Sequence, residues 1–225
     1  EFKVAWIDGL NLSNNYKIIY ESANFCKNSN ELVNKKIKQF QIKFFQTFLL
    51  NPFFVKLFNW LYFNFKKEGN KVCHIYDFLF NLDKIKNWNK FYGNNGFLQY
   101  QFVVPNKNAY LVINKLFKYI ENQSIRSYLI VIKKFGKGNM NYLSFPLSGF
   151  TVSLDLKMNS KNKQFINNFQ KSINKYGAHV YLAKDSCLKK KIFKDSYDLH
   201  KFKKVRRKYN LNGYFNSFQS LRLDL

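Results

Sequence analysis

The chain has few of the residues that organise metal sites, disulfide frameworks and phosphate-binding loops. Its 225 residues include three cysteines, three histidines, three prolines and nine glycines. The cysteines lie far apart, without a CxxC pair or a Cys/His spacing typical of a metal site, so reduced cysteines are expected. The sequence has no GxGxxG pattern, no P-loop and no internal repeat. These absences argue against a zinc module, a disulfide scaffold and a dinucleotide-binding domain within this sequence.

Acidic residues and arginine are also scarce. The sequence has 13 acidic and 38 basic residues, a formal charge of +25, yet arginine occurs at only four positions. Proteins that read nucleic acid usually cluster their charge and use arginine for bidentate contacts. Here the lysines are spread along the whole chain beside abundant Asn, Phe, Ile and Tyr, the residue set that AT-rich codons specify. We interpret much of the charge as compositional drift, with a general attraction to phosphate or anionic lipid as its consequence.

The composition favours a packed protein over disorder or a membrane span. Hydrophobic residues make up 46% of the chain and aromatic residues 20%, enough for one large domain or two small ones. The most apolar region, 44–65, is interrupted by Asn51, Pro52, Lys56 and Asn59, so it is a poor membrane span. Burial in the protein's own core is the prediction for this region. The alternative is a helix that lies on a bilayer surface by its aromatic face.

Hydrophobic periodicity predicts an α+β fold with a largely antiparallel sheet flanked by helices. Apolar alternation at period two predicts strands, and apolar residues at three- and four-residue spacing predict helices. Strand pairs interrupted by two long helices, without regular βαβ alternation, favour this fold class. The expected strands cover 2–8, 17–25, 72–80, 96–104, 128–135, 150–158 and 180–183; the expected helices cover 44–65, 82–92, 108–122, 161–176 and most of the tail from 189, with 27–43 as a surface segment.

Polar groups interrupt or follow three of the apolar segments. The segment YLAKDS at 181–186 places a phenol, an ammonium and a carboxylate directly after an expected strand. Gln99 and Gln101 share one face of their strand, where two amides are costly to bury without partners. Lys133 lies on another strand and shares its face with three apolar side chains, Leu129, Val131 and Phe135.

Four ordered segments and the tail carry a family resemblance: 4–8, parts of 82–105, 143–149, 180–186 and 193–225. Together they resemble the C-terminal half of the decaprenylphosphoryl-β-D-ribose oxidase family. That family belongs to the FAD-linked oxidases, with the sugar-lactone oxidases and vanillyl-alcohol oxidase. The resemblance implies a cap domain with an antiparallel sheet at 1–178 and a segment at 179–225 that returns to an FAD domain. We expect that FAD domain to lie upstream, and these 225 residues alone to be inactive and to bind no FAD tightly.

The resemblance implies a role for each polar group. Lys184 matches the family's pocket lysine beside flavin and substrate, where it would orient a sugar hydroxyl and, with its pKa lowered by desolvation, accept a proton. Tyr181 would contact the flavin together with Lys184. Gln99 and Gln101 would contact sugar hydroxyls, and Lys133 would bind the phosphate of a lipid-phosphoryl sugar. The remaining substrate-side positions would be Leu129, Val131, Phe135, Trp6, Thr151 and Ser153.

Departures from the family pattern bear on the substrate. Well-known members carry Tyr-His-Pro-Leu-Asp where this chain has Leu-Phe-Asn-Leu-Asp at 79–83, and Asn and Cys where it has Thr151 and Ser153. The leading hypothesis is FAD-dependent oxidation of a secondary alcohol of a lipid-phosphoryl pentose, the first half of a 2′-epimerisation that a partner reductase completes. The alternatives are a D-arabinono-1,4-lactone oxidase-like or other alcohol oxidase, and a basic module that binds nucleic acid or a membrane surface. The leading hypothesis implies a bacterial enzyme, cytoplasmic or peripheral at the inner face of the membrane, without a metal or a specific nucleic-acid partner.

Overall fold

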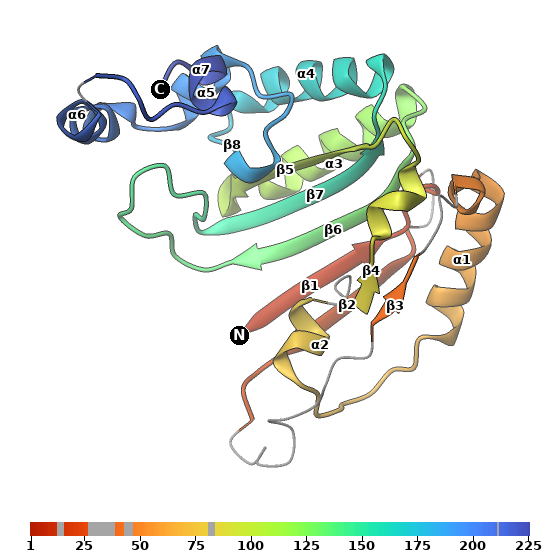
Figure 1. Cartoon of the computed structure of the whole chain (residues 1–225). Helices are drawn as coiled ribbons and strands as arrows, with labels where there is room; N and C mark the ends of the chain where they lie inside the picture. Colours follow the sequence, from red (N-terminus) through yellow and green to blue (C-terminus); the bar gives the residue numbers. More distant parts are fainter. Residues whose placement is uncertain (13–15, 27–38, 43–46, 81–83, 211) are drawn as a thin grey trace.

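The computed structural model describes residues 1–12, 16–26, 39–42, 47–80, 84–210 and 212–225 (Figure 1). Its main sheet is built from β1 (Phe2–Ile7), β2 (Ile18–Ala23), β5 (Phe97–Pro105), β6 (Ser127–Phe135), β7 (Gly149–Lys157) and β8 (His179–Val180). The strand order is β2-β1-β6-β7-β5-β8, and every neighbouring pair in it is antiparallel. The predicted α+β class with an antiparallel sheet is therefore confirmed.

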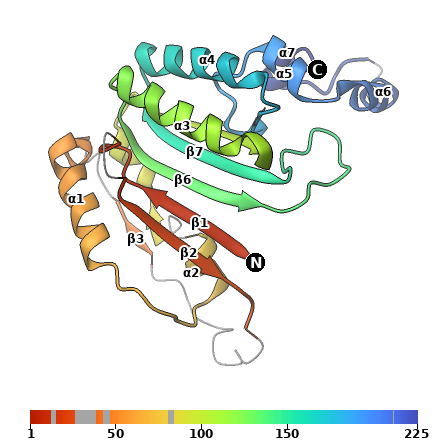
Figure 2. The same ribbon diagram turned by 180° about the vertical axis from the view of Figure 1, so that it is seen from behind.

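Two long helices cover one face of this sheet. They are α3 (Asn106–Asn122) and α4 (Ser160–Asn174), which lie behind β5 and β7 in Figure 1 and in front of them in Figure 2. Phe102 of β5 is fully buried between sheet and helices, as are Phe165 and Phe169 of α4. The chain leaves α4 through Gly177, whose φ of +70° suits a glycine after a helix end. The apolar sides of both helices therefore pack against the sheet and form the main core with it.

The C-terminal segment is helical, as predicted. Its helices are α5 (Lys190–Ser196), α6 (Leu199–Tyr209) and α7 (Phe218–Leu223). The structure shows β8 hydrogen-bonded to β5, and Phe193 of α5 is fully buried in the same core as α4. The described part of 179–225 thus shares its sheet and core with the preceding residues, and a boundary at 178 stays a prediction about the complete protein.

The helix α1 (Pro52–Phe65) packs on the opposite face of the sheet, over β1 and β2. It follows a 3₁₀ helix (Thr47–Leu50), and Asn51 caps its N-terminus: the Asn51 Oδ1 accepts the Phe53 N–H at 3.0 Å, and Pro52 occupies the first turn. Its inner side contacts the sheet: Asn59 Nδ2 donates to Asp8 Oδ1 at 2.7 Å, and Tyr62 lies 5.2 Å from Trp6 between ring centroids. The helix was correctly predicted.

Burial of the 44–65 region in the core was wrong for most of α1. Only Val55 and Asn59 of the helix are buried, because the strand pair β1–β2 offers a narrow surface that one side of the helix covers. The large apolar side chains on its other side are exposed. A helix can be apolar on nearly all sides and still bury only one of them.

Asn59→Ala is expected to lower the free energy of unfolding by about 2 kcal/mol. The change removes the side-chain donor of the buried Asp8 carboxylate and leaves it with the Leu10 N–H, and the loss of a hydrogen-bond partner from a buried charged group costs about 1–3 kcal/mol. The matched control is Asn64→Ala in the same helix, because Asn64 is exposed and donates only to the Trp60 carbonyl oxygen. Urea denaturation of both variants measures the difference. Equal losses would show that the Asn59–Asp8 contact adds no stability.

Two short elements differ from the predictions. The expected strand 72–80 is wrong: the structure has the helix α2 (Ile75–Leu79), where the His74 side chain accepts the Tyr76 N–H. The expected helix 82–92 is also wrong, because Asn87 adopts left-handed backbone angles (φ 62°) between β4 (Ile85–Lys86) and a 3₁₀ helix (Trp88–Tyr92). The strand β4 pairs in parallel with β3 (Phe40–Gln41). Residues 81–83 and most of the expected surface segment 27–43 lie outside the described residues.

Candidate functional site

The predicted substrate-side residues lie on one face of the sheet. Residues paired across antiparallel strands share a face, and the register pairs Gln101 with Ser153 and Ser153 with Val131. The pairing of Val131 with Trp6 extends this face to β1. It is the face that α3 and α4 leave open, and it looks toward the viewer in Figure 1. The predicted residues on it are Trp6, Gln99, Gln101, Leu129, Val131, Lys133, Phe135, Thr151 and Ser153.

Both glutamines of β5 make hydrogen bonds to the neighbouring strand β7. Gln101 Nε2 donates to Thr151 Oγ1 at 2.9 Å, and the Thr151 hydroxyl donates in turn to the Phe102 carbonyl oxygen at 2.9 Å. Gln99 Nε2 donates to Asp155 Oδ1 at 3.1 Å. These bonds hold the amides in place on the sheet. Within the part of the chain that the structure describes, Gln101 Oε1 has no hydrogen-bond donor and remains available to a ligand.

A buried carboxylate belongs to this site and was not predicted. Asp155 follows Thr151 and Ser153 at period two on β7, so all three side chains share the open face. Only 2% of Asp155 is exposed, and burial raises the pKa of its carboxyl to about 6, against the opposing effects of the Gln99 hydrogen bond and the Lys184 charge. The signal was present in the sequence, because an acidic residue alternates there with Val152, Leu154 and Leu156.

Lys184 reaches the same face from the C-terminal segment. It ends a one-turn 3₁₀ helix (Leu182–Lys184) after β8, and its N–H donates to the Tyr181 carbonyl oxygen at 2.9 Å. Its Nζ lies 3.5 Å from Ser153 Oγ, the upper limit of a hydrogen bond. Half-burial lowers the pKa of the Lys184 ammonium; the Asp155 carboxylate opposes this shift and the charge of Lys133 adds to it. An ammonium, a carboxyl group and a hydroxyl therefore converge.

Lys133 is the second cation of the face. It pairs with Thr151 across β6 and β7 and with Val4 across β6 and β1. Its side chain remains accessible to solvent, but its apolar surroundings desolvate the ammonium and lower its pKa. Its neighbour Lys134 lies on the opposite face, where the ammonium sits 5.7 Å from the centre of the Phe150 ring. The two lysines are thus in different environments although they are adjacent in sequence.

A cavity of about 330 Å³ opens beside these groups. Gln101 forms its polar wall, and Tyr181 lies against Phe145 with 4.6 Å between ring centroids. Phe135 supplies a further aromatic wall, and Leu143, Pro146 and Leu182 complete the lining. Of the predicted residues, three border this cavity: Gln101, Phe135 and Tyr181. Lys184, Ser153 and Lys133 lie beside it on the sheet, whereas Trp6 packs on α1, and Leu129 and Val131 are elsewhere on the same face.

Comparison with known proteins relates the chain to an oxidase. No family model matches the sequence. Over 165 residues it is 34% identical to decaprenylphosphoryl-β-D-ribose oxidase of Mycolicibacterium smegmatis. The aligned region is 72% of this chain and 36% of that oxidase, so the chain spans about a third of the relative's length.

Proposed function

We propose that this chain is the cap part of an FAD-dependent oxidoreductase that oxidises a secondary alcohol of a lipid-phosphoryl pentose. The observation that carries the proposal is the convergence of Lys184, Asp155 and Ser153 beside a cavity on the open face of the sheet. Similarity to an oxidase that is named for decaprenylphosphoryl-ribose supports the substrate class. In this proposal residues 1–178 form the cap, and residues 179–225 return to the FAD domain.

The residues at the cavity fit the ring end of FAD. Tyr181 offers an aromatic ring held by Phe145, and Lys184 offers a half-buried ammonium that can donate to a ring oxygen or nitrogen. The described residues contain no glycine-rich turn into a helix that would cradle a pyrophosphate, so we assign only contacts with the ring system to this chain. When bound, FAD supplies the acceptor for the two electrons that leave the alcohol carbon.

Lys184 is the residue that we assign to the hydroxyl proton. Desolvation lowers the pKa of Lys184 and so favours the neutral amine, which can accept a proton from the alcohol. Asp155 stabilises the charged form that results, since its carboxylate acts on Lys184 through the same face of β7. Ser153 keeps the Lys184 side chain over the sheet.

The rest of the face accounts for the other parts of the substrate. The free oxygen of Gln101 accepts a hydrogen bond from a sugar hydroxyl, and the solvent-accessible Lys133 provides a cation for the phosphate group. Phe135, Leu129 and Val131 form an apolar wall on β6. The Thr151 hydroxyl is already hydrogen-bonded to Gln101 and to the Phe102 carbonyl oxygen, so it positions the Gln101 amide rather than contacting the sugar.

The complete protein, reduced anaerobically by candidate substrates, tests this function. A short-chain polyprenylphosphoryl-β-D-ribose should bleach the flavin, with the 2′-keto sugar as product. Bleaching by D-arabinono-1,4-lactone alone would favour the aldonolactone oxidase alternative. A complete protein that carries no flavin would refute the proposal. A partner reductase would be sought by adding a nicotinamide-dependent enzyme fraction to the 2′-keto product.

Gln101→Ala is expected to raise the KM for the sugar substrate about tenfold with a smaller effect on kcat. The change removes one hydrogen bond to a neutral hydroxyl, which is worth about 1 kcal/mol or slightly more. Steady-state kinetics of the complete protein measure it, with Gln164→Ala on the exposed side of α4 as the control. A KM equal to that of the control would remove Gln101 from the binding site.

A further inference from the structure

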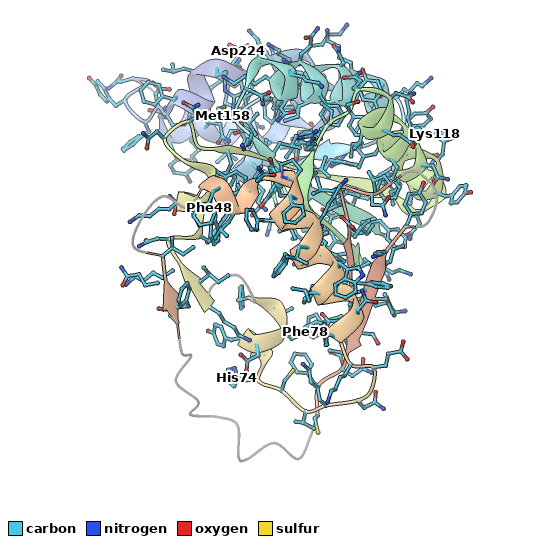
Figure 3. The ribbon with its side chains drawn as sticks, turned by 90° about the vertical axis from the view of Figure 1, so that its right-hand side faces the viewer. Phe48, His74, Phe78, Lys118, Met158 and Asp224 are labelled. Carbon is cyan, nitrogen blue, oxygen red and sulfur yellow. The ribbon has the colours of Figure 1, made fainter. Side chains whose placement is uncertain are left out.

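The outer side of α1 is an apolar surface that the described part of the protein leaves uncovered. Figure 3 looks onto this helix, whose side chains are drawn between the labelled Phe48 and Phe78. Soluble proteins rarely leave a contiguous apolar patch of this kind without a function. The residues of this side, called the α1 outer face below, are 40% to 73% exposed and are Phe53, Phe54, Leu57, Phe58, Trp60, Leu61 and Phe65.

Helix geometry makes these side chains one continuous surface. At 3.6 residues per turn, positions 53, 57, 60, 61 and 64 follow one another along one side of the helix, and 54, 58 and 65 lie next to them. Asn64 is the polar residue among them, and its amide is already bound to the Trp60 carbonyl oxygen. No charged side chain interrupts the surface.

The inner side of α1 fixes this orientation. The Asn59–Asp8 hydrogen bond and the Trp6–Tyr62 contact hold the middle of the helix on β1. At its end, Lys66 forms a 2.6 Å ion pair with Glu21 of β2. Because these polar and aromatic contacts would be lost on rotation, the helix cannot bury its outer face by turning on the sheet.

The sequence of the helix and its flanks carries charge of one sign, whereas the acidic partners of the helix, Asp8 and Glu21, lie on its inner side. From residue 32 to residue 67 the sequence has seven lysines and no aspartate or glutamate. Lys56 and Lys67 are exposed beside or just after the apolar surface. An apolar helix face with aromatic residues and neighbouring lysines is the composition of helices that lie in the interface of an anionic bilayer. This charge pattern complements acidic lipid headgroups.

We propose that the α1 outer face seats the protein on an anionic lipid surface, with α1 lying in the plane of the interface. The described helices include none that is long and apolar enough to cross a membrane. Trp60 and the phenylalanines enter the boundary between headgroups and acyl chains, while Lys56 and Lys67 stay at the headgroups. The inference stands apart from the proposed chemistry, because it uses no residue of the cavity.

If the proposed function holds, the position of α1 would also bring a lipid-linked substrate to the open face of the sheet. Both α1 and the cavity lie on the side of the sheet opposite α3 and α4, and Trp6 belongs to the face that carries Lys133 and Ser153. A lipid-phosphoryl sugar could keep its chain in the bilayer while its sugar reaches the open face.

Vesicle co-sedimentation of the complete protein tests the proposal. The protein should bind phosphatidylcholine vesicles that contain phosphatidylglycerol at least about tenfold more tightly than vesicles of phosphatidylcholine alone. Combined Phe58→Ser and Trp60→Ser should weaken binding to the anionic vesicles at least about tenfold, because two large apolar side chains no longer enter the interface. Both side chains are exposed, so the variant should fold.

The matched control uses exposed hydrophobic residues away from α1. Tyr110→Ser, combined with Leu111→Ser beside it on the exposed side of α3, should leave vesicle binding within about twofold of the parent protein. Lipids brominated in the acyl chains should quench the tryptophan fluorescence, and Trp60→Phe should remove most of this quenching. That readout reports insertion of the helix and not mere attraction of a basic protein.

Four results would overturn the proposal. They are equal binding by the Phe58/Trp60 variant, no binding to anionic vesicles, equally tight binding to heparin with no quenching by brominated lipid, and shielding of Trp60 from aqueous quenchers before vesicles are added. The last would show that another part of the protein or a second copy covers the α1 outer face. Flavin reduction by a water-soluble short-chain substrate would separate such a failure from failure of the proposed function.

Discussion

Lys184→Met in the complete protein is expected to slow reduction of the flavin by substrate by at least about 100-fold. A group that transfers a proton in the rate-determining step contributes about 10²–10⁴-fold, and methionine keeps the length and apolar stem of lysine without the amine. Lys184 is half-buried beside Asp155 and Ser153, so no other described amine replaces it at this point of the site. Anaerobic single-turnover kinetics measure the rate, with flavin content as the check on folding and cofactor binding.

Two further variants separate the roles of charge and proton transfer at this position. Lys184→Arg keeps a cation but removes the proton acceptor, because arginine stays protonated, so reduction should remain slow while substrate still binds. In the Lys134→Met variant, changed on the opposite face of the sheet, substrate should reduce the flavin at the parent rate. If substrate reduces the flavin of the Lys184→Met variant at the parent rate, Lys184 does not accept the hydroxyl proton. If flavin reduction is fast in the Lys184→Arg variant but slow in the Lys184→Met variant, the role of Lys184 is electrostatic only.

The faces of the individual strands could be predicted from the sequence. Period-two alternation placed Gln99 with Gln101, and Lys133 with Val131 and Phe135, and the register confirms both sets. The order of the strands could not be predicted, because pairing between β1 and β6 joins residues more than 120 positions apart and leaves no local pattern. The sequence therefore gives the contents of each strand face, and only the structure shows that these faces adjoin.

Three features could not be predicted, each for a different reason. Asn87 interrupts the helix expected at 82–92 because its short polar side chain tolerates the left-handed conformation. The spacing of apolar residues does not reveal this backbone conformation. The exposure of α1 was missed for another reason: apolar spacing predicts a helix, but the area of sheet available to cover it depends on strand order. Asp155 was missed although its alternation with Ser153 was visible, since its interest comes from burial beside Lys184.

Asp155→Asn is expected to stabilise the protein at pH values above about 6 while impairing the reaction. Burial raises the pKa of Asp155 from 3.8 to about 6, so the unfolded chain loses this proton at lower pH than the folded protein. The contribution of Asp155 to stability is therefore complete below about pH 4 and is lost as the pH rises through about 6. At about pH 8 the loss corresponds to about 3 kcal/mol, from a shift of about two pKa units.

Asparagine can still accept the Gln99 hydrogen bond but carries no charge to desolvate. The difference in unfolding free energy between variant and parent should thus be near zero at about pH 4 and reach about 3 kcal/mol at about pH 8. Urea denaturation across this range measures it, and Asp195→Asn on the exposed side of α5 serves as the control. An unchanged pH dependence of stability would show that burial does not raise the pKa of Asp155.

The same variant shows why a costly carboxylate would be kept. Without its charge, the protonated form of Lys184 loses its stabilising partner, so the pKa of Lys184 should fall further and the pH dependence of flavin reduction should shift to lower pH. Stability gained together with activity lost is the pattern expected where a site retains an unfavourable group for chemistry. If the variant is both more stable and fully active, Asp155 has no part in the reaction and its burial has no functional explanation here.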